Sequence, residues 1–497
     1  MDSAFKVIFS KKTFFIIGGL SIVAFLVSLY NRYIYIDDAW FGEQAYWLAR
    51  DGIVKAVSIR DFFDWDTHLL VYHKLHIIIG ALLIKIFGWS VTPLRVFNLL
   101  VLLFFVFTLS QYFQKRKSIF INGETMIALF FVAINPLLAL YGYTYRPEIL
   151  VMTFGFISYI LLDRYLTEEK KQYRIIFAGI FSGLSFFTHL NGMIFGMAGF
   201  ILLLWYRMYK QGFIFGLFTI VIAAFYFYDL LPLENFHAFL YQMANFPDSQ
   251  GSQYFNHSIS EILLAIFSKL ADEHMRFFWS YKVWGFSALF ILLTILNFSF
   301  LAKKHKQLLI YLFALIICLN VFGSQIAERF LLLFLPYMII IISIGIGKLI
   351  SRKNIIFKSL VLILLALNIA GLVMVFQDIF KRNGDSIAEH SQIMAQIPDD
   401  GSSVLVNYAF VFDELKNCDL ITYKTFEYDQ VRLKKTFTQT EFFNKSVGLH
   451  IEYIVVPPDM TIGDDSRFPF LCDGIIDENP LYFLWRKDAD YLILKRK

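Results

Sequence analysis

Long apolar runs separated by short polar connections make up the chain as far as residue 377. A helix that crosses the hydrocarbon core of a bilayer needs about 20 mostly apolar residues. Eleven runs approach this length, and they lie near residues 13–30, 94–113, 125–143, 147–163, 175–188, 192–206, 212–231, 281–301, 307–323, 330–349 and 355–377. The pattern predicts an α-helical polytopic membrane protein with about eleven transmembrane helices, the first of them uncleaved.

A further apolar run at 75–89 is shorter and contains Lys85. Cytoplasmic loops are enriched in Lys and Arg, so the basic connections indicate which face is inside. If 75–89 does not cross, all six basic connections lie on one face, whereas a crossing would move every later one to the other face. We therefore predict that 75–89 is a juxtamembrane or re-entrant helix on the outer face, and that the N-terminus is cytoplasmic.

On this topology six parts of the chain lie outside, namely 31–74, 144–147, 189–191, 232–280, 324–329 and everything after 378. Beyond 378 the pattern changes, because strand-like runs at 403–410, 450–458 and 491–497 alternate with polar segments of helical pattern and with residues typical of turns. We therefore predict two domains. Residues 1–377 form the transmembrane domain, and residues 378–497 form a small soluble α/β or α+β extracytoplasmic domain.

Composition agrees with this division. The chain is 58% hydrophobic and 17% charged, against roughly 45–50% and about 25% in an average soluble protein. The net charge of +5 comes from positively charged residues in short loops, so no nucleic-acid partner is predicted.

Cys418 and Cys472 both lie in the predicted outer domain. They either form a disulfide or stay as two free thiols, and the sequence leaves both possibilities open.

Ionisable residues at a membrane boundary are unfavourable, so those at the outer face are functional candidates. Asp37 and Asp38 follow the first span, Arg146 and Glu148 flank a proline in a very short turn, and Arg329 precedes a late apolar run. Each also has a structural interpretation: helix capping for the Asp pair, a local salt bridge for the turn, and snorkelling for Arg329. Their coincidence on one face favours a shared site.

Weaker candidates lie near the same face. His189 and Asn191 end a predicted span, where they either line a cavity or make helix-end hydrogen bonds. His73 and His76 have a spacing that allows a metal if the segment is helical, but the sequence does not favour a divalent metal. We expect no cofactor, and we include His73 with His189 and Asn191 as cavity-lining candidates.

With these motifs the chain resembles the GT-C superfamily of polyprenyl-phosphate-sugar glycosyltransferases, in its protein O-mannosyltransferase and aminoarabinose-transferase-like branch. The acidic pair after the first span and the Arg-Pro-acid turn two spans later carry the resemblance, together with the juxtamembrane stretch YHKLHIIIGALLIKIFGW and the late helix start ERFLLLFLPYMIII. It covers roughly residues 13–350. Asp38 stands where the family usually has Glu, and Glu148 where Asp is more common.

The resemblance implies a sugar donor on polyprenyl phosphate, presented from the outer leaflet of the membrane. Asp37 would be the general base, with Asp38 as its alternative, and Glu148 would orient hydroxyl groups. Arg329 and Arg146 would bind the donor phosphate, whose developing charge needs cations. A single displacement implies inversion at the anomeric carbon, and the acceptor is left open among protein, lipid and glycan.

A polytopic lipid or solute transporter or flippase without catalytic activity is the alternative. Transporters typically carry inverted repeats and ionisable residues near the bilayer midplane; here no clear repeat is found and the acids lie at the outer boundary. An O-antigen-type ligase or polymerase is a third interpretation. We expect a multi-pass protein of the plasma (inner) membrane of a bacterium.

Overall fold

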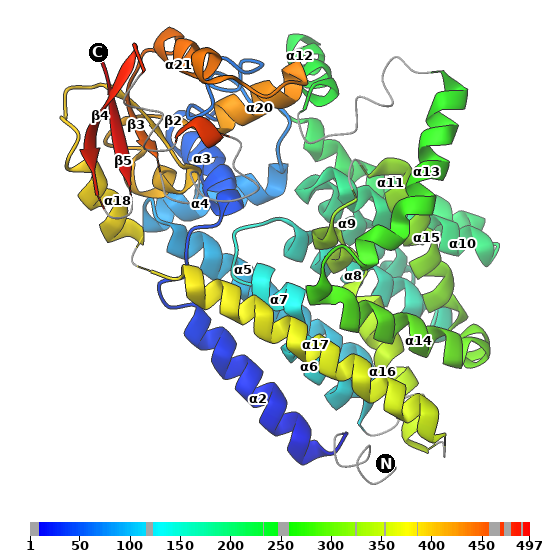
Figure 1. Cartoon of the computed structure of the whole chain (residues 1–497). Helices are drawn as coiled ribbons and strands as arrows, with labels where there is room; N and C mark the ends of the chain where they lie inside the picture. The colour runs from blue at the N-terminus through cyan, green and yellow to red at the C-terminus, as the bar shows by residue number, and fades with distance from the viewer. Residues whose placement is uncertain are drawn as a thin grey trace.

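The computed structural model describes residues 9–115, 123–231, 233–246, 258–323, 326–351, 354–384, 386–456, 468–471, 479–488 and 491–497. The described chain is a bundle of helices with one small sheet near its C-terminus (Figure 1). This is the predicted fold class.

The helices of the bundle and of its connections are α2 (Lys11–Ser28), α3 (Ile36–Asp51), α4 (Lys74–Phe87), α5 (Val91–Lys115), α6 (Glu124–Ala133), α7 (Pro136–Tyr141), α8 (Glu148–Thr167), α9 (Gln172–Thr188), η1 (Leu190–Gly192), α10 (Met193–Trp205), α11 (Tyr209–Ala223), η2 (Ala224–Phe227), α12 (Leu233–Ala244), α13 (Ile259–Phe277), α14 (Tyr281–Lys304), α15 (Lys306–Phe322), η4 (Glu328–Leu333), α16 (Leu335–Ser351) and α17 (Ile355–Arg382). Every predicted span lies over one of these helices. The span predicted at 125–143 is divided, because Asn135 caps α7 through hydrogen bonds from the amides of Leu137 and Leu138 and Pro136 starts it.

By length and composition, six helices of the described chain can cross a membrane: Lys11–Ser28, Val91–Gln114, Glu148–Thr167, Tyr209–Phe227, Tyr281–Lys304 and the helix that begins at Ile355. Four more apolar helices are shorter. The number of eleven spans therefore stays a prediction. Large apolar side chains such as Phe15 and Leu20 of α2 and Phe107 of α5 are exposed, which is typical of helices whose outer faces contact lipid.

The connections predicted to be outside meet at one end of the bundle. Gly384 after α17 donates its backbone N–H to the carbonyl of Asn31 after α2. Arg95 in the first turns of α5 donates to the carbonyls of Arg32 (2.9 Å) and Tyr33 (2.7 Å). The end of α2 and the start of α5 are therefore neighbours, so the segment between them, which contains α3 and α4, begins and ends at the same end of the bundle. This agrees with the prediction for 75–89, while which side of the membrane this end faces stays a prediction.

The C-terminal elements form a five-stranded sheet of order β2-β1-β3-β5-β4. Its strands are β1 (Ser403–Val406), β2 (Asp419–Thr422), β3 (Ile451–Val456), β4 (Tyr482–Lys487) and β5 (Leu492–Arg496), and its helical turns are α18 (Ser386–Met394), η5 (Tyr408–Phe410), α19 (Val411–Glu414), α20 (Lys424–Leu433), α21 (Gln439–Gly448) and η7 (Pro469–Leu471). β1 is parallel to β2 and β3, and β5 is antiparallel to β3 and β4. The predicted mixed α/β character is confirmed.

Cys418 packs at the edge of one hydrophobic cluster of this domain. Cys472 lies outside the described residues, so the disulfide between the two stays a prediction.

Helix α3 joins the sheet domain to the bundle (Figure 1). A Cβ at Gly42 would overlap the ring of Phe412, so only glycine allows α3 and α19 to approach this closely. One residue on, the fully buried Glu43 accepts hydrogen bonds from the hydroxyls of Ser58 and Tyr408, both at 2.6 Å. These contacts fix how the sheet domain lies over the end of the bundle.

Candidate active site

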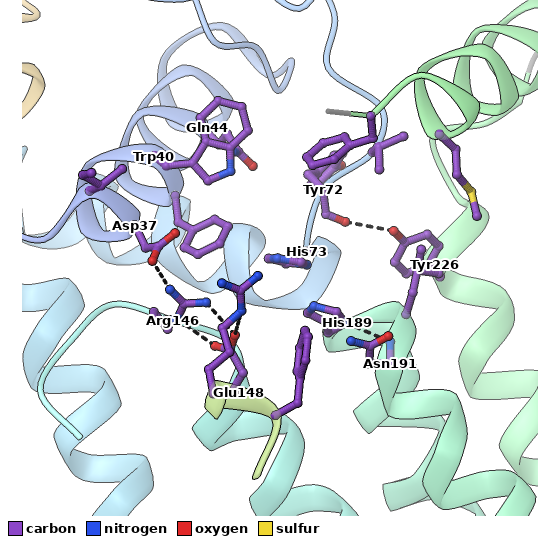
Figure 2. Close-up of a pocket in the computed structure, with 18 of the residues that line it drawn as sticks. Asp37, Trp40, Gln44, Tyr72, His73, Arg146, Glu148, His189, Asn191 and Tyr226 are labelled. Carbon is purple, nitrogen blue, oxygen red and sulfur yellow. Dashed lines mark hydrogen bonds and ion pairs between the residues drawn. The ribbon is translucent and has the colours of Figure 1, made fainter. Parts of the chain in front are cut away.

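A cavity of about 380 Å³ opens where α3, the chain before α4, the turn before α8, the α9–α10 connection, η4 and the sheet domain meet. Seven of the eight predicted site residues line it: Asp37, His73, Arg146, Glu148, His189, Asn191 and Arg329. Figure 2 shows most of them converging from separate helices. The expectation that Asp37 and Glu148 face one cavity is confirmed.

Four charged side chains form a row along the cavity floor. Asp37 is ion-paired with Arg146, whose Nη2 and Nε donate to the Glu148 carboxylate at 2.7 and 3.1 Å. Arg329 Nε lies 3.8 Å from Glu148 Oε1. Charges therefore alternate along the row, and both ends of it reach the cavity, since the side chains of Asp37 and Arg329 are 25% and 33% exposed.

The short turn that carries Arg146 is held from several sides. Asn98 of α5 donates to the Arg146 carbonyl at 2.9 Å, and the Tyr145 hydroxyl donates to the carbonyl of His76 at 2.8 Å. A Cβ at Gly80 would collide with that hydroxyl, so glycine on α4 is what admits Tyr145. The guanidinium is therefore positioned by the fold before any ligand arrives.

Asp38 is the one predicted site residue that does not line the cavity. Its carboxylate is fully buried and ion-paired with Arg95 at 2.6 Å, and it also accepts from the backbone amides of Tyr145 (2.6 Å) and Tyr35 (3.0 Å). Both of its oxygens are thus engaged. This geometry contradicts the predicted catalytic role and makes Asp38 a positioning residue that ties α3 to α5 and to the turn before Arg146.

His73 and His189 stack face to face with their ring centroids 4.2 Å apart. Desolvation lowers the pKa of His189 to about 4 against the opposing effect of Glu148, and desolvation with the neighbouring His189 lowers the pKa of His73 well below its usual value. His189 Nδ1 accepts from the amide of Asn191 at 2.9 Å, so the helix-end hydrogen bond weighed for this segment is also present. Both shifts favour the neutral form of the ring.

His76 stacks on Tyr145, with ring centroids 4.1 Å apart, and is not among the residues that line the cavity. His73 and His76, three residues apart in the sequence, therefore stack on different rings: His73 on His189 and His76 on Tyr145. Within the described ranges no three His, Cys, Asp or Glu side chains gather in a metal-binding arrangement.

Sequence reasoning missed several members of the site. Trp40 and Gln44 line the cavity on the same face of α3 as Asp37, at i+3 and i+7, and this helical spacing was the available signal. Tyr408 and Tyr428 come from the sheet domain, and nothing local in the sequence pointed to them.

Lys74 and Asp229 form a buried ion pair of 2.7 Å beside the cavity, and Tyr72 donates to the same carboxylate at 2.7 Å. Burial lowers the pKa of Lys74 to about 8, against the opposing effect of Asp229. The pair joins the start of α4 to the end of η2. Asp229 is the charged residue near the end of the otherwise apolar run at 212–231, and this feature of the sequence could have identified it.

No known protein-family model matches this sequence, and no curated protein matches it. Among solved structures, however, several have the same fold as this chain, and ArnT and an archaeal oligosaccharyltransferase are among them. ArnT from Cupriavidus metallidurans in the apo state is similar with a TM-score of 0.60 at 11% identity, over 98% of each chain. The same protein bound to undecaprenyl phosphate gives a TM-score of 0.56 at 10% identity, again over 98% of each chain.

The archaeal oligosaccharyltransferase AglB from Archaeoglobus fulgidus, in complex with an inhibitory peptide and a dolichol-phosphate, is similar with a TM-score of 0.51 at 11% identity. The match covers 95% of this chain and 73% of that chain. At identities this low, structural similarity shows a shared fold and does not show a shared activity. The activity has to be argued from the cavity.

Proposed function

We propose that this protein is a membrane glycosyltransferase that moves a sugar from a polyprenyl-phosphate donor to an acceptor hydroxyl. The observation that carries the proposal is the charged row, which places a reachable carboxylate, Asp37, and a reachable guanidinium, Arg329, in one cavity. Glycosyl transfer from a phosphate needs both, because a proton leaves the acceptor while charge develops on the leaving group.

The donor phosphate binds at Arg329, with Arg146 as its second contact. Arg329 is the more accessible of the two, and Arg146 is engaged by both Asp37 and Glu148. Part of the cavity lining is apolar, with Phe186, Leu190 and Phe322, and suits the polyprenyl chain. Undecaprenyl phosphate in the ArnT structure and dolichol-phosphate in the AglB complex support this class of donor.

The reaction is a single displacement. The acceptor oxygen bonds to the anomeric carbon from the side opposite the phosphate, while the bond from that carbon to the phosphate oxygen breaks and its electron pair leaves with the phosphate. Asp37 takes the acceptor proton, and the configuration inverts. A phosphate that competes for Arg146 would loosen its pairing with Asp37 and leave the carboxylate able to act as the base. Glu148 keeps Arg146 in place.

The protein then works as a multi-pass protein of the plasma (inner) membrane, with a cytoplasmic N-terminus and an extracytoplasmic domain at 378–497. The cavity opens on that outer side, where lipid-linked sugars and their acceptors meet. Neither a cofactor nor a nucleic-acid partner enters the proposed reaction.

Turnover in detergent micelles separates an enzyme from a transporter, because micelles have no two sides across which to move a lipid. Purified protein is incubated with undecaprenyl-phosphate sugars labelled in the sugar, together with an envelope extract as the source of acceptor. We expect release of undecaprenyl phosphate and label in a new product. Donor that stays intact, while the same protein in vesicles moves it between leaflets, would instead establish the transporter alternative.

A further inference from the structure

Gln44 is a buried amide that the fold leaves unsatisfied. Its side chain lines the cavity and the residue is 1% exposed, yet neither Oε1 nor Nε2 has a hydrogen-bond partner among the described residues. Buried polar groups are nearly always paired, because burying them unpaired is unfavourable. An unsatisfied amide aimed into a cavity indicates a ligand that supplies the missing partners.

Aromatic rings surround the part of the cavity next to Gln44. Trp40 lies one turn before it, with its ring 6.1 Å from that of Tyr408 and 5.6 Å from that of Trp65. Trp65 in turn lies 5.7 Å from Tyr428 of α20. We call the part lined by Trp40, Gln44, Tyr408 and Tyr428 the aromatic chamber. It is built jointly by α3 and the sheet domain.

The aromatic chamber and Arg146, a proposed contact of the donor phosphate, lie on opposite sides of Asp37. Asp37 contacts Arg146 at the start of α3, whereas Gln44 is seven residues further on, roughly 10 Å along the helix axis. Figure 2 shows the same order, with Gln44 and Arg146 on either side of Asp37. An inverting displacement brings the acceptor in from the side away from the phosphate, and that side is the aromatic chamber.

We propose that the aromatic chamber is the acceptor site and that the acceptor is a carbohydrate, whose ring stacks on Trp40 while vicinal hydroxyls bond to the Gln44 amide. This rests on the proposed function. A sugar ring has apolar C–H faces that suit an aromatic wall, and two adjacent hydroxyls match the donor and acceptor that one amide offers. An extended peptide would bring a backbone N–H and C=O at every residue and would need more polar partners than Gln44 provides.

Binding to the purified full chain in nanodiscs tests this without any donor. The probes are methyl glycosides of a hexose, a pentose and a 2-acetamido hexose, with a Ser/Thr-containing hexapeptide for comparison, and saturation-transfer NMR reads binding. We expect saturable binding of at least one glycoside, weakened roughly tenfold or more in Gln44→Leu through the loss of two hydrogen bonds. Gln430→Leu, in α20 of the sheet domain and not among the residues that line the cavity, is the control and should bind as the wild type does.

Thermal melting distinguishes a binding role from a structural one. Gln44→Leu keeps the volume and removes an unpaired amide, so its melting temperature should equal or exceed that of the wild type. Glycoside binding unaffected by Gln44→Leu, binding of the peptide alone, or no saturable glycoside binding would each overturn the proposal. Failure of donor turnover in the wild type would instead count against the proposed function, because glycoside binding is read without donor.

Discussion

Asp37 and Asp38 are neighbours at the start of α3, yet their carboxylates lie in different surroundings. The Asp37 side chain is 25% exposed in the cavity and pairs with one guanidinium, whereas Asp38 is fully buried among Arg95 and two backbone amides. The difference continues along the helix, where Trp40 and Gln44 face the cavity while Gly42 and Glu43 face the sheet domain.

On the proposed function, one face of α3 therefore carries the catalytic carboxylate, and the other face holds the sheet domain on the bundle. A carboxylate that accepts a proton must be reachable by the acceptor, and its ion-pair partner must have room to move. A carboxylate that holds segments together needs every lone pair occupied, since a buried charge is tolerated only when paired and hydrogen-bonded. The same substitution at the two positions should consequently change different properties of the protein.

Asp37→Asn should give the largest functional effect. The amide keeps the shape of the side chain and cannot take the acceptor proton, so the rate of sugar transfer should fall roughly 10²–10⁴-fold. The melting temperature should change little, because Asp37 lies at the edge of the cavity. Initial rates with saturating undecaprenyl-phosphate sugar measure the first quantity, and full activity in this variant would exclude Asp37 as the base.

Asp38→Asn should instead damage the fold. It leaves the Arg95 guanidinium buried opposite a neutral amide, and breaking one partner out of a buried pair typically lowers the free energy of unfolding by about 3–5 kcal/mol. We expect a clearly lower melting temperature or poor recovery of folded protein. Melting of Asp37→Asn and Asp38→Asn side by side gives the sharpest comparison; equal melting temperatures would show that the two faces of α3 are not distinct.

Arg329→Ala should weaken binding of undecaprenyl phosphate by roughly 10-fold to 100-fold, the range expected for hydrogen bonds to a charged group. Arg329→Lys should retain part of the affinity, because Lys keeps the charge and loses the bidentate geometry. Titration of the lipid against the purified variants measures the effect. Identical affinity in the wild type and in Arg329→Ala would remove Arg329 from the donor site.

Glu43→Gln tests the face of α3 that contacts the sheet domain, and it should lower stability less than Asp38→Asn does. Burial raises the pKa of Glu43, while donors from Ser58, Tyr408 and Trp47 oppose that rise. A glutamine amide would turn an N–H₂ group toward these donors, and the loss should lower the free energy of unfolding by about 1–3 kcal/mol. Proteolysis should then release the sheet domain sooner, while the affinity for undecaprenyl phosphate stays unchanged. A variant that lowers that affinity would place Glu43 in the cavity instead.

Much of the fold could be predicted because a bilayer imposes simple rules. Apolar length marked the helices, and the distribution of Lys and Arg placed 75–89 at one end of the bundle, where α4 is found. The turn at Arg146 and the late Arg329 were identifiable because ionisable side chains at a membrane boundary need a reason to be there.

The rest depends on contacts that no local pattern encodes. Which of Asp37 and Asp38 faces the cavity follows from the rotation of α3, and that rotation is set by Phe412 against Gly42 and by Arg95. Tyr408 reaches the cavity rim through a hydrogen bond to a residue 365 positions earlier in the chain. The part of the cavity that the sheet domain builds therefore could not be predicted from the sequence alone.

The smallest effect concerns the pH dependence of folding stability. His189 in the cavity has its pKa lowered to about 4, while a histidine in the unfolded chain has a pKa of about 6.5. Between these values the unfolded state binds more protons, so stability should be complete above about pH 6.5 and fall as the pH drops toward 4, by at most about 1.4 kcal/mol per pH unit from this group. Burial lowers the pKa of His189, the charge of Glu148 raises it, and the charges of Arg329 and Arg146 lower it further. In His189→Gln the melting temperature should therefore depend less steeply on pH from 6.5 to 4 than in the wild type. Identical slopes in the wild type and in His189→Gln would mean that the pKa of His189 is the same in the folded and unfolded protein, and that burial in the cavity does not lower it.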